Sequence, residues 1–135
     1  MTAWLPPALF ALLNFGLWGF FSKITVMNID SKSALFFQSV GVFVIGIVAL
    51  MLMDFKPATE WKGLTFGVLT GLCSGIGSLF FLIAVDKGKS STIVTLTSLY
   101  PVITILLSYV ILREGFHLKQ TLGIVFALLS LYLLV

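Results

Sequence analysis

The chain has 135 residues, of which 59% are hydrophobic and 10% are charged, and its mean hydropathy is +1.15. A soluble domain carries roughly 25% charged residues, so this composition excludes a soluble enzyme, a disordered segment and a disulfide scaffold. The net charge is +3, and the charged residues lie in pairs between apolar runs rather than on one patch, which argues against a nucleic-acid partner. We therefore expect an integral membrane protein whose solvent is the lipid bilayer.

Charged residues, prolines and polar clusters divide the chain into five apolar runs of about 18 to 23 residues. About 20 apolar residues are needed to cross a hydrocarbon core of about 30 Å. Because hydrocarbon cannot hydrogen-bond to the backbone, each spanning segment must satisfy its own amides and carbonyls, which an α-helix does. We predict an all-α membrane protein with a single transmembrane domain over residues 1–135, a bundle of five helices at residues 5–22, 33–53, 63–85, 91–112 and 118–135.

The first run carries Asn14 and Trp18, four residues apart and so on one helix face. An uncharged amide in hydrocarbon needs a partner, so we expect Asn14 to face the bundle interior. There it could bind either a neighbouring helix or a substrate. Trp18 would supply an aromatic wall and one N–H donor.

The third run carries glycines at every fourth position, at Gly63, Gly67, Gly71 and Gly75. Small residues at this spacing let helix backbones approach closely in membranes. We therefore predict a helix-packing face. Cys73 lies in the same run and is the only cysteine, so no internal disulfide can form.

The fourth run has Pro101 near its centre, and proline removes one helical hydrogen bond and opens the turn before it. The carbonyl of Thr97 then lacks its usual partner. Thr97, Tyr100, Thr104 and Ser108 follow at helical spacing and form a hydroxyl-bearing stripe. We predict a substrate-binding surface at this kink, although the hydroxyls could instead bond within the helix or to neighbouring helices.

The fifth run repeats the small-residue spacing with Gly123, Ala127 and Ser130. This stripe is a candidate subunit interface, for the same reason of close backbone approach.

The basic residues of the loops are evenly divided between the two sides of the membrane. With five spans, four lie on one side and four on the other: Lys56, Lys62, Arg113 and Lys119 against Lys23, Lys32, Lys87 and Lys89. An excess of Lys and Arg in short loops normally sets the orientation. Without an excess, either the chain inserts in both orientations or another signal decides.

No residue pattern of a catalytic centre, metal site or phosphate loop is present in the sequence. We expect no enzymatic activity, no cofactor and no metal. The five acidic residues all fall at the membrane surface, whereas proton-driven exchangers usually carry a buried acid. Either a carboxylate such as Asp86 or Glu114 folds inward, or transport is not coupled through a buried carboxylate.

Several stretches resemble the EamA domain of the drug/metabolite transporter superfamily. The closing half of the domain is matched by Ser91–Ser108, Leu112–Glu114 and Gly123, and its most specific part is Pro101–Glu114 with Gly123. Two shorter motifs fit the same pattern, namely Trp18-Gly19 with Lys23, and Ala84–Gly88.

The resemblance implies a ten-helix carrier made of two inverted five-helix repeats around a central cavity, with this chain as one repeat. Because five is odd, a second copy must be inverted to complete the carrier, and balanced loop charge suits an antiparallel homodimer. An inverted homologous subunit could take the same place. Related small multidrug exporters carry a glutamate in their first helix, where this chain has Asn14, so their cation/proton mechanism is not carried over.

We accordingly expect a transporter that exports amino acids, metabolites or drug-like compounds by alternating access, located in the bacterial inner membrane. Its substrate would be a small neutral, zwitterionic or moderately apolar molecule. A subunit of a flippase for lipid-linked sugars or lipids is one alternative. A membrane scaffold or accessory subunit that transports nothing is another. The expected pocket residues are Asn14, Trp18, Thr97, Tyr100, Pro101, Thr104 and Ser108.

Overall fold

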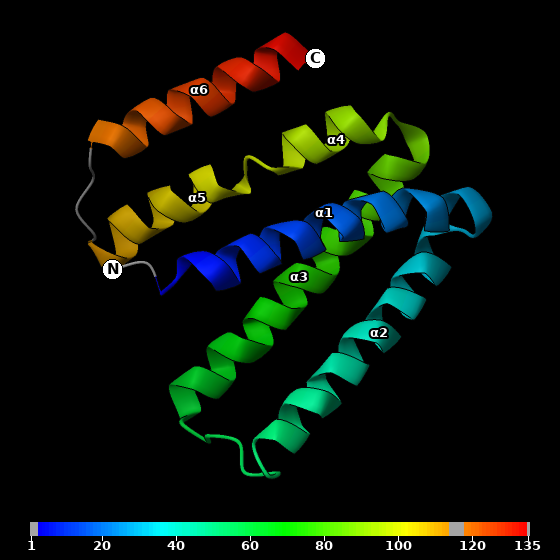
Figure 1. The fold of residues 1–135 in the computed structure, drawn as a ribbon, viewed down its shortest axis with the longest axis vertical. Helices are drawn as coiled ribbons and strands as arrows, with labels where there is room; N and C mark the ends of the chain where they lie inside the picture. Colours follow the sequence, from blue (N-terminus) through cyan, green and yellow to red (C-terminus); the bar gives the residue numbers. More distant parts are fainter. Residues whose placement is uncertain (1–2, 114–117, 135) are drawn as a thin grey trace. The chain divides into compact units, whose positions relative to one another are not determined.

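The computed structural model describes residues 3–113 and 118–134, and all regular structure in this part of the chain is helical (Figure 1). The helices are α1 (Leu5–Asn28), α2 (Ser31–Leu52), α3 (Trp61–Lys87), α4 (Ser90–Thr97), α5 (Tyr100–Leu107), the π-helix η1 (Ser108–Leu112) and α6 (Leu118–Leu134). The chain divides into two compact units, the first ending at Lys87 and the second beginning at Gly88. The predicted all-α fold class is confirmed.

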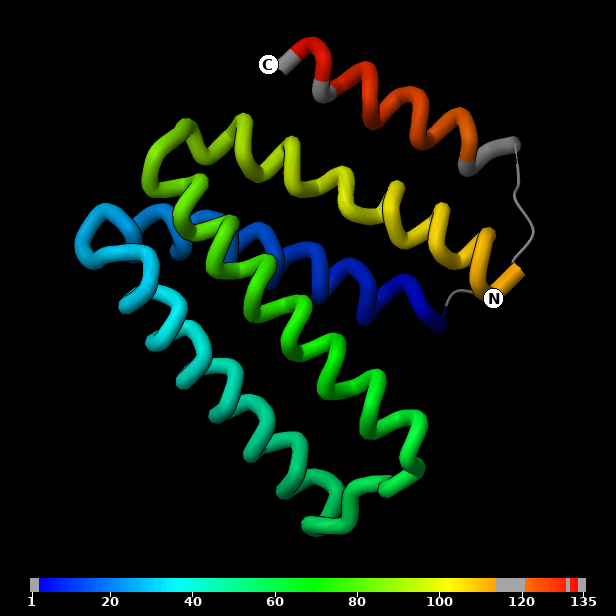
Figure 2. Tube along the Cα trace, turned by 180° about the vertical axis from the view of Figure 1, so that it is seen from behind, coloured from blue at the N-terminus to red at the C-terminus, as the bar shows by residue number. Residues whose placement is uncertain are grey.

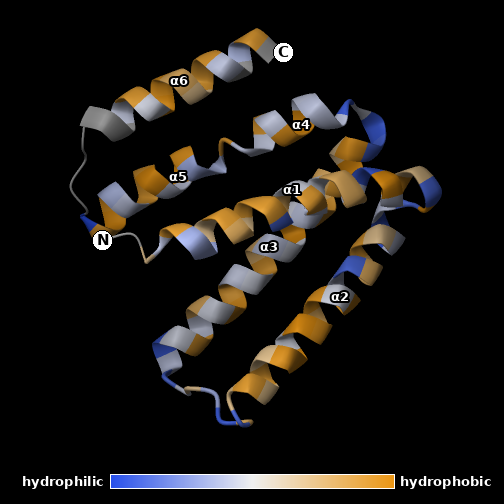
Figure 3. Ribbon diagram, in the orientation of Figure 1, coloured by the Kyte–Doolittle hydropathy of each residue, from blue (hydrophilic) through white to orange (hydrophobic). Residues whose placement is uncertain are grey.

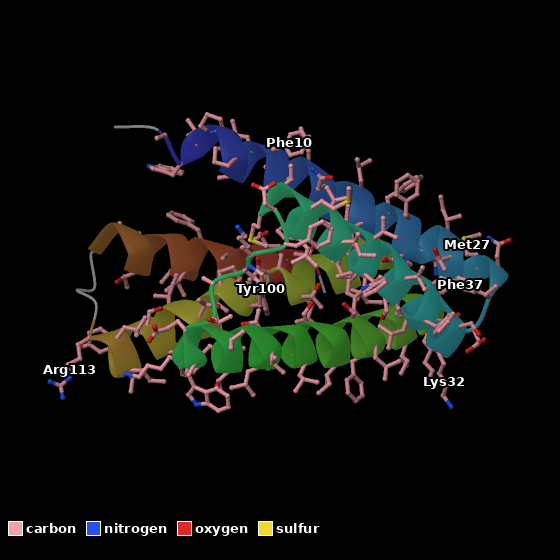
Figure 4. The ribbon with its side chains drawn as sticks, turned by 90° about the horizontal axis from the view of Figure 1, so that it is seen from below. Phe10, Met27, Lys32, Phe37, Tyr100 and Arg113 are labelled. Carbon is pink, nitrogen blue, oxygen red and sulfur yellow. The ribbon has the colours of Figure 1, made fainter. Side chains whose placement is uncertain are left out.

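Within the described residues, four helical segments are long and apolar enough to cross a membrane: α1, α2, α3 and the stretch Ser90–Leu112. The fifth, α6, contains the shorter apolar stretch Thr121–Ser130. Hydrophobic residues run along each helix, and hydrophilic residues gather at the turns and helix ends (Figure 3). Lys32, at the start of α2, and Arg113, after η1, both extend away from the ribbon (Figure 4).

In the first unit, α1, α2 and α3 all contact one another, and they are packed most closely at one end. Figures 1 and 2 show this end, where the α1–α2 turn lies beside the last turns of α3. The buried residues are Gly19, Ser22, Val26, Ala34, Ser78, Phe81, Leu82 and Val85. At the other end, every α3 residue from Trp61 to Ser74 is exposed. The core of this unit therefore lies at the end where α1 and α3 finish.

The first helix is longer than the sequence suggested, because α1 continues past Ser22 to Asn28. We assigned Lys23 to a loop because of its charge. Instead, its ammonium Nζ donates a hydrogen bond of 2.8 Å to the backbone carbonyl of Val85 in α3. This contact gives the ammonium a partner inside the packed end, and the helix ends five residues later, at Asn28.

Both ends of α2 have recognisable capping structures. Asp30 is the N-cap, and its carboxylate accepts hydrogen bonds from the amides of Lys32 and Ser33 and from the Ser33 hydroxyl. At the other end, the amides of Asp54 and Phe55 bond to carbonyls of the last turn, as in a Schellman motif. Asp54 has a φ of 50°, a conformation that usually favours glycine. The helix is therefore fixed at both ends within the turns.

In the second unit, the fourth predicted helix is divided rather than continuous, and α6 lies beside α4. The α-helix stops at Thr97 and resumes at Tyr100, immediately before Pro101. Tight-turn hydrogen bonds bridge the gap, from the amide of Leu99 to Leu96 and from Val102 to Leu99. The segment then ends in the π-helix η1, after which Arg113 adopts a left-handed conformation with φ 55°.

The remaining helix bounds differ from those expected by a few residues at each end. The second helix begins two residues earlier and ends one earlier, and the third gains two residues at each end. These residues are polar or aromatic groups that continue the helix into the membrane surface. The fifth helix runs to Leu134, and Val135 lies outside the described residues.

The Asp30 cap makes part of the stability pH-dependent. Hydrogen bonds from the Ser33 hydroxyl and amide lower the pKa of Asp30 below its ordinary value. A lowered folded-state pKa stabilises the fold above the unfolded pKa, and this contribution is lost as pH falls through the folded pKa. We expect Asp30→Ala to lower the thermal midpoint in detergent at pH 7, with the difference from wild type shrinking below about pH 4.

Asp30→Asn is the matched control, because asparagine is also a good N-cap but does not titrate. It should keep most of the midpoint and remove the pH dependence. An Asp30→Ala midpoint equal to that of the wild type at pH 7 would contradict the capping role.

Candidate functional site

The residues predicted to bind substrate fall into two groups, one in each unit. Asn14 and Trp18 lie on α1 in the first unit. Asn14 is exposed, and its Nδ2 donates a hydrogen bond of 2.8 Å to the carbonyl of Phe10, one turn earlier. This bond occupies one of its two N–H groups. The amide oxygen and the second N–H remain the groups that could contact a substrate or another chain.

Trp18 is held against α3 by an aromatic contact. Its ring lies 4.5 Å from that of Phe81, centroid to centroid, with an interplanar angle of 27°. Phe81 is 6% exposed, whereas Trp18 keeps 36% of its surface exposed. Stacked aromatic pairs add about 0.5–1.5 kcal/mol beyond the area they bury. One face of the indole is therefore fixed by protein, and part of the side chain stays accessible.

The second contact between α1 and α3 is the hydrogen bond from Lys23 to the Val85 carbonyl. The last four carbonyls of a helix have no amide partner within that helix, and α3 ends at Lys87. Lys23 supplies the missing donor and places a positive charge at the negative end of the helix dipole. The two motifs that fit the EamA pattern in this half of the chain, around Trp18 and around Val85, are thus joined in space.

The second group of predicted residues lies on the divided segment of the second unit. Thr97 ends α4, and its hydroxyl donates to the carbonyls of Ile93, at 2.8 Å, and Val94, at 3.1 Å. Pro101 has no amide hydrogen to offer the Thr97 carbonyl. Thr97 therefore presents a carbonyl at the gap, while its hydroxyl proton is used within its own helix.

Tyr100 and Pro101 open α5, Thr104 lies one turn later, and Ser108 begins η1. The hydroxyl of Thr104 donates to the Tyr100 carbonyl at 3.3 Å, again within the helix. Tyr100 is 63% exposed, and Figure 4 marks its position. Each hydroxyl that donates to its own helix still has lone pairs with which to accept a hydrogen bond. The stripe is therefore rich in acceptors and carries the Tyr100 ring as its apolar surface.

The predicted packing glycines have open space beside them. A Cβ built at Gly67, Gly71, Gly75 or Gly123 would meet nothing within 4 Å, and at Gly63 it would meet only Cβ of Glu60 at 4.0 Å. On α6, Ala127 is half-buried and Ser130 is exposed. Close packing at these stripes thus remains a prediction about contact with another chain.

Among the described residues, no three His, Cys, Asp or Glu side chains come together as metal ligands. The predicted site residues offer amides, hydroxyls, carbonyls and aromatic rings. Groups of this kind bind uncharged molecules by hydrogen bonding and stacking.

The sequence was compared with models of known protein families. The model of the EamA-like transporter family matches residues 3–135, which is nearly the whole chain. The chain belongs to the EamA-like transporter family. As a member of this family with apolar helices, it is an integral, multi-pass membrane protein that transports small solutes.

Two relatives of this EamA-like chain differ in length. An uncharacterised protein of Methanocaldococcus jannaschii is 36% identical over 124 residues, which cover 89% of this chain and 87% of that protein. The glucose uptake protein GlcU of Staphylococcus xylosus is 27% identical over 99 residues, which are 73% of this chain but 33% of the relative. GlcU is therefore about three times 99 residues long, roughly twice the 135 of this chain. No solved structure matches the chain.

Sequence reasoning missed two residues that the structure joins to the predicted ones. Phe81 was one of 13 phenylalanines with nothing local to mark it. Lys23 was assigned to a loop, although its spacing from Trp18 in the EamA-like motif was the signal that could have placed it on the same helix.

The stacked pair makes a test with a matched control. In a variant with Trp18 as the only tryptophan (Trp4→Phe, Trp61→Phe), we expect Phe81→Ala to shift the emission maximum of Trp18. It should lower the free energy of unfolding by about 3–5 kcal/mol, because it removes a buried ring as well as the stacking. Phe80→Ala removes the neighbouring ring, which is 65% exposed, and should change neither quantity. Equal effects of the two substitutions would contradict the stacking.

Proposed function

We propose that the chain forms an antiparallel homodimer that carries a small uncharged polar solute across the membrane by alternating access. The observation that carries this proposal is the equal number of basic residues toward the two membrane surfaces, four and four, with Lys23 counted at the end of α1 and Lys119 at the start of α6. Orientation in the membrane follows the imbalance of Lys and Arg, so a balanced chain has no preferred direction of insertion. Insertion in both directions supplies the two halves of an inverted pair.

The lengths of the relatives support the same assembly. GlcU is about twice as long as this chain, whereas the relative from Methanocaldococcus jannaschii is close to it in length. One polypeptide of double length and two polypeptides of single length would supply the same number of helices. The glycine stripe of α3, with open space beside it, offers a face on which a second copy could pack.

The proposed substrate-binding residues form two groups, Asn14 and Trp18 in the first unit, and Thr97, Tyr100, Pro101, Thr104 and Ser108 in the second. The accessible groups of these residues are uncharged, and no Asp, Glu, Lys, Arg or His lies near the middle of a span. Hydroxyl and amide groups beside exposed aromatic rings suit a sugar, whose hydroxyls bond and whose C–H face stacks. The printed name of GlcU makes glucose the first solute to test on this chain.

An inverted pair of identical chains has no intrinsic direction. Its two-fold axis lies in the membrane plane, so the pocket is equivalent when it is open to either side. The solute gradient then sets the direction of net flow. This reconciles the export that we expected from the sequence with the uptake in the name of GlcU.

Insertion in both directions predicts a definite labelling result. In a chain with Cys73→Ala and a single new cysteine at Thr59, an exposed position in the α2–α3 loop, a membrane-impermeant maleimide should label about half of the protein in intact cells. The rest should react after lysis, because each orientation places Thr59 on a different side. Labelling that is complete or absent in intact cells would show one orientation and overturn the homodimer.

Two substitutions test the pocket itself. We expect Thr97→Val and Tyr100→Ala to reduce the movement of radiolabelled glucose into proteoliposomes roughly three- to tenfold, as loss of one ligand hydrogen bond or stacking surface would. Crosslinking should show that the dimer persists in both.

Thr65→Val and Tyr132→Ala are matched controls. Thr65 also bonds to its own helix, at 3.0 Å from the Trp61 carbonyl, and Tyr132 is 81% exposed on α6. Both controls should transport as the wild type does. Normal transport by Thr97→Val and Tyr100→Ala would show that the pocket is wrongly assigned, and a wild-type chain that moves no glucose would exclude that sugar. A membrane scaffold would lose only stability in these variants.

A further inference from the structure

We propose that Lys23 is a positioning residue, which sets the axial register of α1 on α3 and thereby holds the indole of Trp18 in the orientation in which it contacts the solute. This inference rests on the proposed function only for its effect on transport. The structural part depends on two contacts within the first unit and stands without it.

Two specific contacts join α1 to α3 about one helical turn apart. Trp18 stacks on Phe81, and Lys23 bonds to the carbonyl of Val85. The contacts are five residues apart on α1 and four apart on α3, which correspond to rises of about 7.5 and 6 Å. Residue numbers increase in the same direction on both helices, so α1 and α3 run parallel here. Two contacts about one turn apart fix both the sliding and the rotation of one helix on the other.

Apart from the Lys23 bond, the register of α1 on α3 depends on side-chain packing. The helices are not consecutive, since α2 lies between them in the chain. In lipid, the hydrophobic effect does not drive helices together, so packing and hydrogen bonds decide the register. Between the two contacts, α1 contributes the small buried residues Gly19 and Ser22, whereas α3 contributes Leu82, which is 1% exposed. The small side chains of α1 allow close approach but interdigitate little, so they leave part of the register to the two specific contacts.

The Lys23 ammonium stabilises the C-terminal end of α3. Val85 lies in the last turn of α3, so its carbonyl has no amide partner within the helix. Parallel helices bring like ends of their dipoles side by side, and a positive charge there offsets the repulsion. The Lys23 side chain is half-buried and Nζ lies 2.8 Å from the carbonyl oxygen. Removing it leaves a polar group without its donor in a region of low polarity, and α1 can then shift to satisfy the group in another way.

The test compares lysines that carry the same charge on the same side of the membrane. Lys23→Met and Lys32→Met change the loop charge balance identically, but only the first removes the bond to Val85. Lys32 points away from the ribbon at the start of α2 (Figure 4). In the chain with Trp18 as the only tryptophan, the emission maximum and the accessibility of Trp18 to acrylamide quenching are measured for both, together with Lys23→Arg.

We expect Lys23→Met to shift the emission of Trp18 and to increase its quenching, as Phe81→Ala does. Lys32→Met should match the wild type, and Lys23→Arg should restore most of the difference, because a guanidinium can also donate to the carbonyl. In glucose transport, Lys23→Met should raise the KM about tenfold, with a smaller change in kcat, since loss of a charge-assisted bond misplaces a binding group. A purely structural role would lower the amount of folded protein and leave the KM unchanged.

The inference is overturned if Trp18 emission and quenching in Lys23→Met equal those of Lys32→Met. Should Lys23→Met fail to accumulate in the membrane, Lys23→Gln is read by the same measurements, because its shorter amide keeps a donor but loses the charge and the reach. Failure of the proposed function is recognised separately. In that case Trp18→Leu leaves transport unchanged, while the effect of Lys23→Met on Trp18 emission persists.

Discussion

Hydrocarbon offers no hydrogen-bond partner for a backbone amide or carbonyl, and this constraint explains why the chain is helical and how its helix ends and interruptions are bonded. The helices satisfy it along their length, and other hydrogen bonds supply partners at several of the interruptions. Short-range bonds bridge the gap between α4 and α5, where Pro101 removes a donor. At the end of α3, the donor comes from Lys23 on another helix. The threonines of the spans follow the same rule, because Thr65, Thr70, Thr97 and Thr104 donate to carbonyls of their own helices.

The same constraint explains which parts of the fold could be predicted from the sequence. Apolar runs of sufficient length mark the spans, because each must be helical, and a proline within a run marks the interruption. The end of α1 could not be predicted in this way. A charged residue normally marks the end of a span, but Lys23 lies inside the helix, where a carbonyl 62 residues away accepts a hydrogen bond from its ammonium. That contact depends on how two non-consecutive helices pack, which no local pattern records.

The candidate site was predictable to a similar extent. Asn14, Trp18 and the stripe around Pro101 stand out because polar or aromatic groups at mid-span are unusual. Phe81 does not stand out, since Phe80 beside it is equally apolar, and only the rotation of α3 against α1 decides which ring is 6% and which 65% exposed. The residues that hold a binding group in place are thus harder to recognise than the group itself. Their chemistry is ordinary, and only their position is particular.

The length of α3 ties the first unit to the thickness of the bilayer. The apolar part of α3, residues 63–85, is about 35 Å long, against a hydrocarbon core of about 30 Å. The apolar part of α2, residues 33–52, to which α3 is joined by a short loop, is about 30 Å long. Such a hairpin accommodates the mismatch by tilting α3 more than α2, and α1 must follow because Lys23 and Trp18 hold it to α3. Lipid chain length would therefore change the angle at which the indole of Trp18 is presented, and the surrounding membrane becomes a determinant of the site.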